Sequence, residues 1–179
     1  MNTKRIRIVG ISGSLRTDSS ATKILKEAGA LFPADVSFEI NTQLEAIPAF
    51  NDSNIIPPVV NDFIEFISNA DGILFCIPEY AFGVPGALKN ALDWTVSSTA
   101  FTDKPVALIT AASSGDKAHA ALSLTLSALG TKMPAGSSLL IPFIRTKINA
   151  EGKVSDPALL QSLRHVVDSL MQTIANNQG

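Results

Sequence analysis

The chain alternates between short apolar runs and longer segments in which apolar residues recur every three or four positions. The short runs have the length and apolar character of strands, and the first of them, residues 6–11, is rich in β-branched residues and ends at a Gly/Ser loop. They cover residues 6–11, 36–40, 72–77, 106–110 and 138–141. The longer segments have the spacing of helices with one apolar face. They cover residues 20–32, 59–67, 85–96, 117–129 and 156–174.

Strand and helix patterns follow one another along the whole chain, which predicts an α/β fold in a single domain over residues 1–179. The strand patterns are apolar almost throughout, as in a parallel sheet covered by helices on both faces. With right-handed crossovers, the result is a doubly wound three-layer sandwich. For its five-stranded sheet we expect the order 2-1-3-4-5, one of the common orders of such folds. Ligands of such sheets lie beyond the carboxyl ends of the strands, where the strand order reverses.

Composition narrows the classes of protein further. The net charge is −2 with scattered basic residues, so no nucleic-acid-binding face is indicated. No apolar stretch is long enough for a membrane span, and the basic start MNTKRIRIVGISGS leads into a strand rather than a signal peptide. We therefore expect a cytoplasmic protein. Cys76, the single cysteine, lies within the apolar run GILFCIP, which favours a buried structural thiol over a catalytic one.

The segment after the first strand, SGSLRTDSSAT, is rich in hydroxyl side chains and leads directly into a helix. Hydroxyls, loop amides and a helix N-terminus together form a site for a phosphate group, to which Arg16 can add a charged pair. The segment matches neither G-x-x-x-x-G-K-[ST] nor G-x-G-x-x-G, which disfavours a nucleoside triphosphatase and a dinucleotide site. The alternative is an ordinary turn with Ser19 or Ser20 as helix cap. Its place after the first strand favours phosphate.

The segment after the third strand, PEYAFGVPGALKNALDW, carries aromatic residues where a strand meets a loop. Tyr80 and Phe82 would be explained by a flat heteroaromatic ligand, or by packing against the neighbouring helix or a partner subunit. Glu79 lacks a second carboxylate or histidine nearby in sequence, so we favour a backbone contact with the ligand over a general-acid role. Leu88, Leu92 and Trp94 have the spacing of core or subunit-interface residues; Leu88 and Leu92 lie on one helical face.

The fourth loop, AASSGDK, is built of small residues that let a backbone approach a ligand closely. Its residues Ser113, Ser114 and Gly115 either contact a cofactor or cap the next helix. His119 and His165 fall on predicted helices without a matching carboxylate motif, so we expect structural roles and no metal site.

The segments GISGSLRTDSS and PEYAFGVPGALKNALDW resemble those of the NAD(P)H-dependent FMN reductases, a family that includes quinone, chromate and azo-dye reductases. The resemblance implies a flavodoxin-like fold, non-covalently bound FMN and NAD(P)H as co-substrate. It also implies a small-molecule electron acceptor such as a quinone or free flavin, and assembly as a homodimer or homotetramer. The helix with Leu88, Asn90 and Trp94 resembles the subunit interface of that family.

The resemblance also implies which residues contact FMN. The phosphate loop comprises Ser12, Ser14, Arg16, Ser19, Ser20, Ala21 and Thr22. The isoalloxazine loop comprises Pro78, Glu79, Tyr80, Ala81, Phe82 and Gly83. The third segment comprises Ser113, Ser114 and Gly115.

The chain departs from the family at two positions, since Ala21 and Ala81 stand where the family often has asparagine. Each change removes a side-chain hydrogen bond worth about 0.5–1.5 kcal/mol. Together the two changes weaken FMN binding by about one to two powers of ten unless Ser20 and Thr22 compensate at the phosphate.

Three functions are compatible with these residues. In the first, hydride passes from NAD(P)H through FMN to an acceptor, with no side-chain acid or nucleophile required. In the second, the protein is a flavodoxin-type electron carrier, although its nearly neutral charge contrasts with the strongly acidic surfaces of such carriers. In the third, it is a flavin-binding or regulatory module without reductase activity, a reading motivated by Ala21 and Ala81.

Overall fold

The computed structural model describes residues 5–53, 55–149 and 151–177. Its strands are β1 (Arg7–Ser12), β2 (Ser37–Asn41), β3 (Gly72–Ile77), β4 (Val106–Ala111) and β5 (Ser138–Ile141). Its α-helices are α1 (Ser20–Gly29), α2 (Pro58–Ser68), α3 (Gly86–Asp93), α4 (Asp116–Ala128) and α5 (Pro157–Asn177). Short 3-10 helices are η1 (Leu44–Ala46), η2 (Ala135–Ser137) and η3 (Ile144–Thr146).

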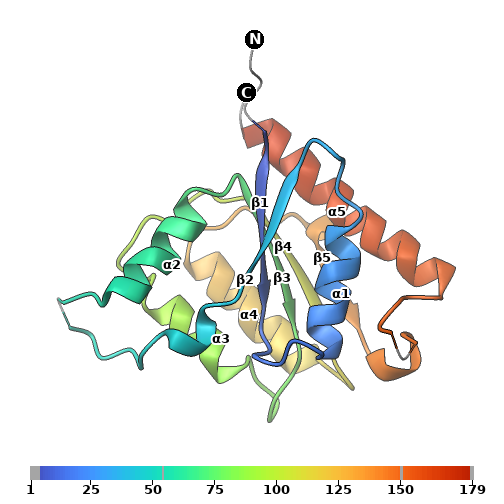
Figure 1. Cartoon of the computed structure of the whole chain (residues 1–179), viewed down its shortest axis with the longest axis horizontal. Helices are drawn as coiled ribbons and strands as arrows, with labels where there is room; N and C mark the ends of the chain where they lie inside the picture. The colour runs from blue at the N-terminus through green and yellow to red at the C-terminus, as the bar shows by residue number, and fades with distance from the viewer. Residues whose placement is uncertain (1–4, 54, 150, 178–179) are drawn as a thin grey trace.

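The strands form one parallel sheet in the order β2-β1-β3-β4-β5, which confirms the predicted topology. Two apolar clusters cover its faces: one contains the buried residues of α1 and α5, and the other those of α2, α3 and α4. Figure 1 shows α1 and α5 on one side of the sheet and α2 and α3 on the other. The chain is therefore a three-layer sandwich, as expected.

The strands at the centre of the sheet are fully buried. Every residue of β3 and β4 is buried, including Cys76, whose thiol pKa is raised by that burial. The carboxyl ends of these strands and of β1 lie at one edge, the lower edge in Figure 1. The loops that follow β1, β3 and β4 therefore meet there, and they hold the candidate ligand contacts.

Two helices are shorter than their sequence patterns suggest. α1 ends at Gly29, because the next amides bond three residues back, from Leu31 to Ala28 and from Phe32 to Gly29, and Pro33 follows. α3 ends at Asp93, where the hydroxyl of Thr95 donates to a backbone carbonyl of the last turn. Within the described residues, no helix combines the length and apolar character required to cross a membrane.

Candidate functional site

The first loop is held in shape by its own hydroxyl groups. The Thr22 hydroxyl lies 2.8 Å from Ser12 Oγ and 2.9 Å from Ser19 Oγ, and it donates to the carbonyl of Arg16. Ser19 also caps α1, because its Oγ accepts the backbone N–H of Thr22 at 3.1 Å. These three side chains are buried and bonded to one another, so they fix the loop.

The donors that remain open lie at the start of α1. The backbone N–H groups of Ser20 and Ala21 have no hydrogen-bond partner within the described part of the chain, as expected for the first amides of a helix. Both residues line a cavity of about 120 Å³. Open amides at a helix N-terminus suit an anion, because the partial positive charge of the helix lies there.

That cavity collects residues from four loops at the edge of the sheet. Its lining consists of Arg16, Ser19, Ser20, Ala21, Pro78, Glu79, Tyr80, Ala111, Ala112, Ser113, Ile144 and Arg145. The structure thus brings together parts of all three segments that the resemblance assigned to FMN. At one end of the cavity, which we call the anion end, lie the open amides of Ser20 and Ala21. At the other end lies the loop after β3 with the aromatic side chain of Tyr80. This combination fits a flavin monophosphate.

Several of the expected contact residues lie outside this cavity. Ser12, Ser14 and Thr22 line a separate cavity of about 190 Å³ beside the end of β2, together with Asn41 and Leu44. Ser14 Oγ lies 3.4 Å from Tyr80 Oη and so connects the first loop with the third. Further predicted contacts outside the 120 Å³ lining are Ala81, Phe82, Gly83, Ser114 and Gly115.

The third loop turns sharply at Ala81 and Phe82. Tyr80 and Gly83 exchange two backbone hydrogen bonds, of 3.1 and 2.9 Å, across these two residues. Ala81 has φ = 48° and Phe82 has φ = 59°, the left-handed pair of a type I′ turn, which Asn and Gly adopt more readily. The Phe82 side chain is 78% exposed and Tyr80 is 51% exposed, so neither is buried against a neighbouring helix of its own chain.

Glu79 has a role that the sequence did not indicate. Its carboxylate accepts backbone N–H bonds from Gly115 at 3.2 Å and from Ala118 at 2.9 Å. It therefore caps α4, whose N-cap residue Gly115 offers no side chain. The bonds also fasten the third loop to the fourth.

The side chains of the fourth loop do not cap α4, since its N-cap residue Gly115 receives no side-chain bond from them. Ser113 lines the cavity, whereas Ser114 donates to the Asp116 carboxylate at 3.0 Å in the first turn of α4. That hydrogen bond and the neighbouring Lys117 lower the pKa of Asp116. Gly115 has φ = 97°, and a Cβ there would lie 2.8 Å from Leu140, so the turn requires glycine.

Four lining residues were not predicted from the sequence: Ala111, Ala112, Ile144 and Arg145. The last two follow β5, whose carboxyl end lies at the same edge as those of the other strands. The predicted parallel sheet could have indicated Ile144 and Arg145, since in such a sheet every strand-to-helix loop lies along that edge.

The histidines lie apart from the cavity. His119 links α4 to two strands, with Nδ1 2.8 Å from Thr110 Oγ1 and Nε2 2.8 Å from Ser138 Oγ. Partial burial lowers the pKa of His119. His165 lies on α5, beside Gly136.

Known proteins resemble the chain in both sequence and structure. An NAD(P)H-dependent FMN reductase of Pseudomonas aeruginosa is 31% identical over 97% of this chain and 98% of its own. An NADPH:quinone oxidoreductase of Arabidopsis thaliana is 40% identical over 58% of this chain and 57% of its own. The solved flavoenzyme NAD(P)H:(acceptor) oxidoreductase FerB from Paracoccus denitrificans superimposes with a TM-score of 0.80 at 27% identity, covering 96% of this chain and 98% of its own.

The family model described as NADPH-dependent FMN reductase matches residues 6–146. The match includes β1 to β5 and all four loops that line the cavity. It thus agrees with the resemblance carried by the first and third loops. The chain belongs to the NADPH-dependent FMN reductase family.

Proposed function

We propose that this protein is an FMN-dependent oxidoreductase that takes hydride from NAD(P)H and delivers it to a quinone, a free flavin or a similar small acceptor. The observation that carries the proposal is the single cavity in which the open N-terminus of α1 meets the loops after β3 and β4. The similarity to an FMN reductase over nearly the whole length of both chains supports the reaction class. Because the reaction consumes NAD(P)H, we place it in the cytoplasm.

The anion end would hold the phosphate of FMN. The N–H groups of Ser20 and Ala21 are its open backbone donors, and the Arg16 guanidinium extends from the same loop. The buried bonds among Ser12, Ser19 and Thr22 keep these donors in place before a ligand arrives. Such preorganisation lowers the entropic cost of binding.

The ring end would be formed by backbone and by Tyr80. Residues 78–80 and 111–113 approach from neighbouring strands β3 and β4. When bound, FMN supplies the hydride chemistry by accepting hydride from a nicotinamide and passing it to the acceptor. Glu79 is the only carboxylate in the described lining, and two amides of α4 already engage it. The chain would therefore orient the reactants and exclude side reactions rather than supply an acid.

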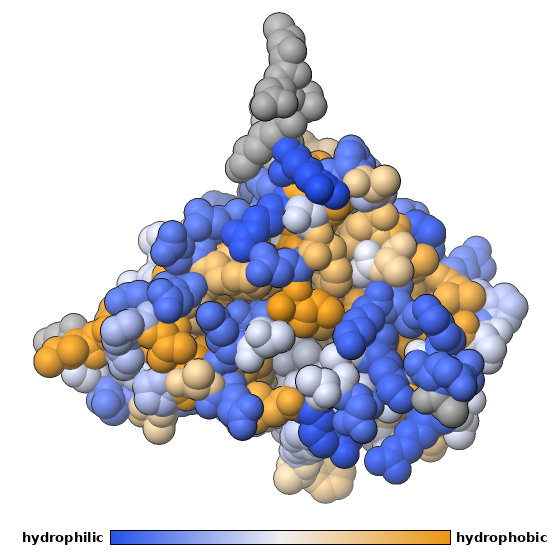
Figure 2. Space-filling model, viewed as in Figure 1, coloured by the Kyte–Doolittle hydropathy of each residue, from blue (hydrophilic) through white to orange (hydrophobic). Residues whose placement is uncertain are grey.

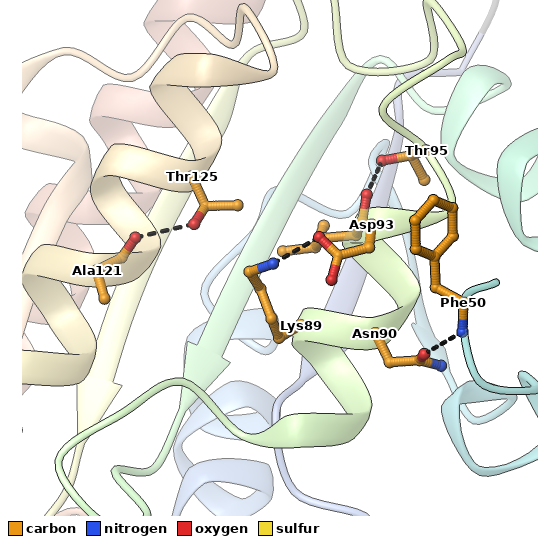
Figure 3. Close-up of polar contacts among 8 residues, drawn as sticks. Phe50, Lys89, Asn90, Asp93, Thr95, Ala121 and Thr125 are labelled. Carbon is orange, nitrogen blue, oxygen red and sulfur yellow. Dashed lines mark hydrogen bonds and ion pairs between the residues drawn. The ribbon is translucent and has the colours of Figure 1, made fainter. Parts of the chain in front are cut away.

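We also propose that the protein assembles as a homodimer or homotetramer through α3 and the loop before α2. Leu88, Leu92 and Trp94 are buried in the core of this chain, so α3 can offer a partner only its polar side. Figure 3 shows part of that side, with Asn90 accepting the backbone N–H of Phe50 and Lys89 paired with Asp93. Figure 2 shows hydrophobic side chains gathered at the tip of the same loop, where Ile55 is 82% exposed.

Light scattering coupled to size-exclusion chromatography tests the assembly by measuring the molar mass in solution. Ile55→Asp should lower the measured mass, and an unchanged monomer in both proteins would refute it.

The function is tested by flavin binding followed by rapid mixing. Apo protein should quench FMN fluorescence on binding and bind riboflavin more weakly. The loaded protein should be reduced by NADPH or NADH in one phase and reoxidised by a quinone in a second, with parallel lines in initial-rate plots. Binding of FMN without reduction by either nicotinamide would favour an electron carrier instead. Failure to bind either flavin would refute the proposal.

A further inference from the structure

The segment after β5 brings Arg145 to the candidate site. The N–H of Phe143 donates to the carbonyl of Ser113, and that of Ile144 to the carbonyl of Ala112, both at 3.1 Å. Ile144 is only 3% exposed and opens the 3-10 helix η3, in which Arg145 is the next residue. The backbone of Arg145 is therefore fixed relative to the loop after β4.

The remainder of this segment is fastened to α1. Lys153 forms an ion pair with Glu27 of α1 at 2.8 Å. A Cβ at Gly152 would clash with the Lys23 side chain, and the φ of 83° is one that side-chain-bearing residues rarely adopt. Figure 1 shows the orange segment after β5 lying near α1 and α5. The two ends of the segment thus hold Arg145 between the loop after β4 and α1.

The position of Ile144 indicates whether Arg145 lies near the N-terminus of α1 or near α3 and α4. Ile144 packs in the apolar cluster formed by α1 and α5, together with Ala21 and Ile24. Leu88 of α3 and Leu122 of α4 belong to the cluster on the opposite face. Arg145 therefore emerges on the α1 side of the sheet, beside the open amides, rather than on the side of the α3 and α4 helices.

The charges at this end are unbalanced. Arg16 and Arg145 come from different loops and both line the cavity, and within the described ranges neither guanidinium has a hydrogen-bond or ion-pair partner. Glu79, the single carboxylate in the described lining, is bonded to amides of α4. Two cations and two open amides at one helix N-terminus suit a ligand group that carries two negative charges.

We propose that Arg145 is a second phosphate-binding arginine, which pairs with the 5′-phosphate monoester of FMN and makes the site select it over flavins without a terminal phosphate. The inference rests on the proposed function and adds this residue to it. A phosphate monoester carries close to two charges at pH 7, since its second pKa is about 6. Riboflavin carries none, and each phosphate in the diphosphate bridge of FAD carries one.

The test is a fluorescence titration of apo protein with FMN, riboflavin and FAD, using wild type, Arg145→Gln, Arg145→Lys and Lys147→Gln. Loss of a charge-assisted pair should weaken FMN binding of Arg145→Gln by about 10- to 100-fold. Riboflavin binding should stay within about twofold, and the preference for FMN over FAD should shrink. Arg145→Lys should recover part of the FMN affinity. Lys147→Gln removes the same charge two residues away, outside the cavity lining, and should bind FMN like wild type.

Two further readouts separate a phosphate contact from a structural effect. Wild-type affinity for FMN should rise from pH 5 to pH 7.5 as the phosphate loses its second proton, and it should fall with added salt. Both dependences should be weaker in Arg145→Gln, whose circular dichroism and melting temperature should match wild type. Unchanged FMN affinity in this variant, or equal losses for FMN and riboflavin, would overturn the inference while leaving the function standing. If wild type binds no flavin, the proposed function fails, and the inference fails with it.

Discussion

Glu79 Oε2 accepts the backbone N–H of Ala118 at 2.9 Å, a bond between residues 39 positions apart in sequence. Through it the loop after β3 serves as the cap of α4, whose own N-cap residue is glycine. A carboxylate that looks available for chemistry from sequence is in this way part of the scaffold that positions two loops of the cavity. The arrangement makes the shape of the site depend on one side chain.

Replacing Glu79 should therefore affect stability and flavin binding together. Glu79→Ala should lower the free energy of unfolding by about 1–2 kcal/mol, the usual cost of a lost helix cap. Glu79→Gln should cost less, because one acceptor oxygen remains although the favourable charge at the helix N-terminus is lost. Urea denaturation and FMN titration measure both effects, with the exposed Glu65→Gln as control. A fully stable Glu79→Ala protein with normal FMN affinity would contradict the assigned role.

The turn at Ala81 and Phe82 should become more stable when a residue suited to positive φ is introduced. A left-handed conformation costs an ordinary residue about 1–2 kcal/mol, and asparagine tolerates it better than alanine. We expect Ala81→Asn to raise the free energy of unfolding by about 0.5–1 kcal/mol. Ala87→Asn, in the first turns of α3, is the control and should not stabilise. Equal effects at both positions would show that the turn holds no such strain.

Stability should depend on pH through His119. Burial lowers its pKa in the folded protein, so folding favours the neutral imidazole. The unfolded chain takes up a proton as the pH falls through about 6.5, and the folded protein does so only at lower pH. The contribution of His119 is therefore complete above pH 6.5 and declines below it until the folded pKa is reached. Urea midpoints between pH 5 and 7.5 measure this, and His119→Gln should flatten the decline.

The thiol of Cys76 should be unreactive until the sheet opens. Burial in β3, a central strand of the sheet, raises its pKa and blocks access. A maleimide should label native protein very slowly and label it within minutes in strong denaturant. Labelling at equal rates in both conditions would show that β3 is exposed in the native protein.

The apolar pattern predicted the strands and their parallel arrangement, because buried parallel strands have nearly uninterrupted apolar sequences, such as GILFCI in β3. The strand order came with the doubly wound fold that this arrangement indicates and not from the pattern itself. The parallel arrangement also predicted where a ligand lies, because the carboxyl ends of parallel strands share an edge. The roles of Glu79 and Arg145 were missed because both depend on contacts between distant segments. The capping bond joins Glu79 to α4, and the carbonyl of Ala112 fixes the turn before Arg145. Neither contact leaves a local pattern in the sequence.

The hydroxyl-rich first loop shows a second limit. Its serines and threonines look alike in sequence, yet Ser12 and Thr22 turn inward to each other, whereas Ser20 and Ala21 present open amides to the cavity. Backbone donors belong to every residue except proline, so their availability follows from the end of a helix rather than from residue type.

The complete burial of β3 and β4 has a consequence for how the molecule opens. Backbone amides at the middle of the sheet should be the last to exchange with deuterium, at rates set by global unfolding. The loops after β3 and β5 carry exposed side chains at the carboxyl edge, for example Tyr80 and Arg145, and should exchange through local openings many times faster. A cofactor would then bind and dissociate at loops that open locally while β3 and β4 stay folded. The apo protein would therefore keep its fold between one binding event and the next.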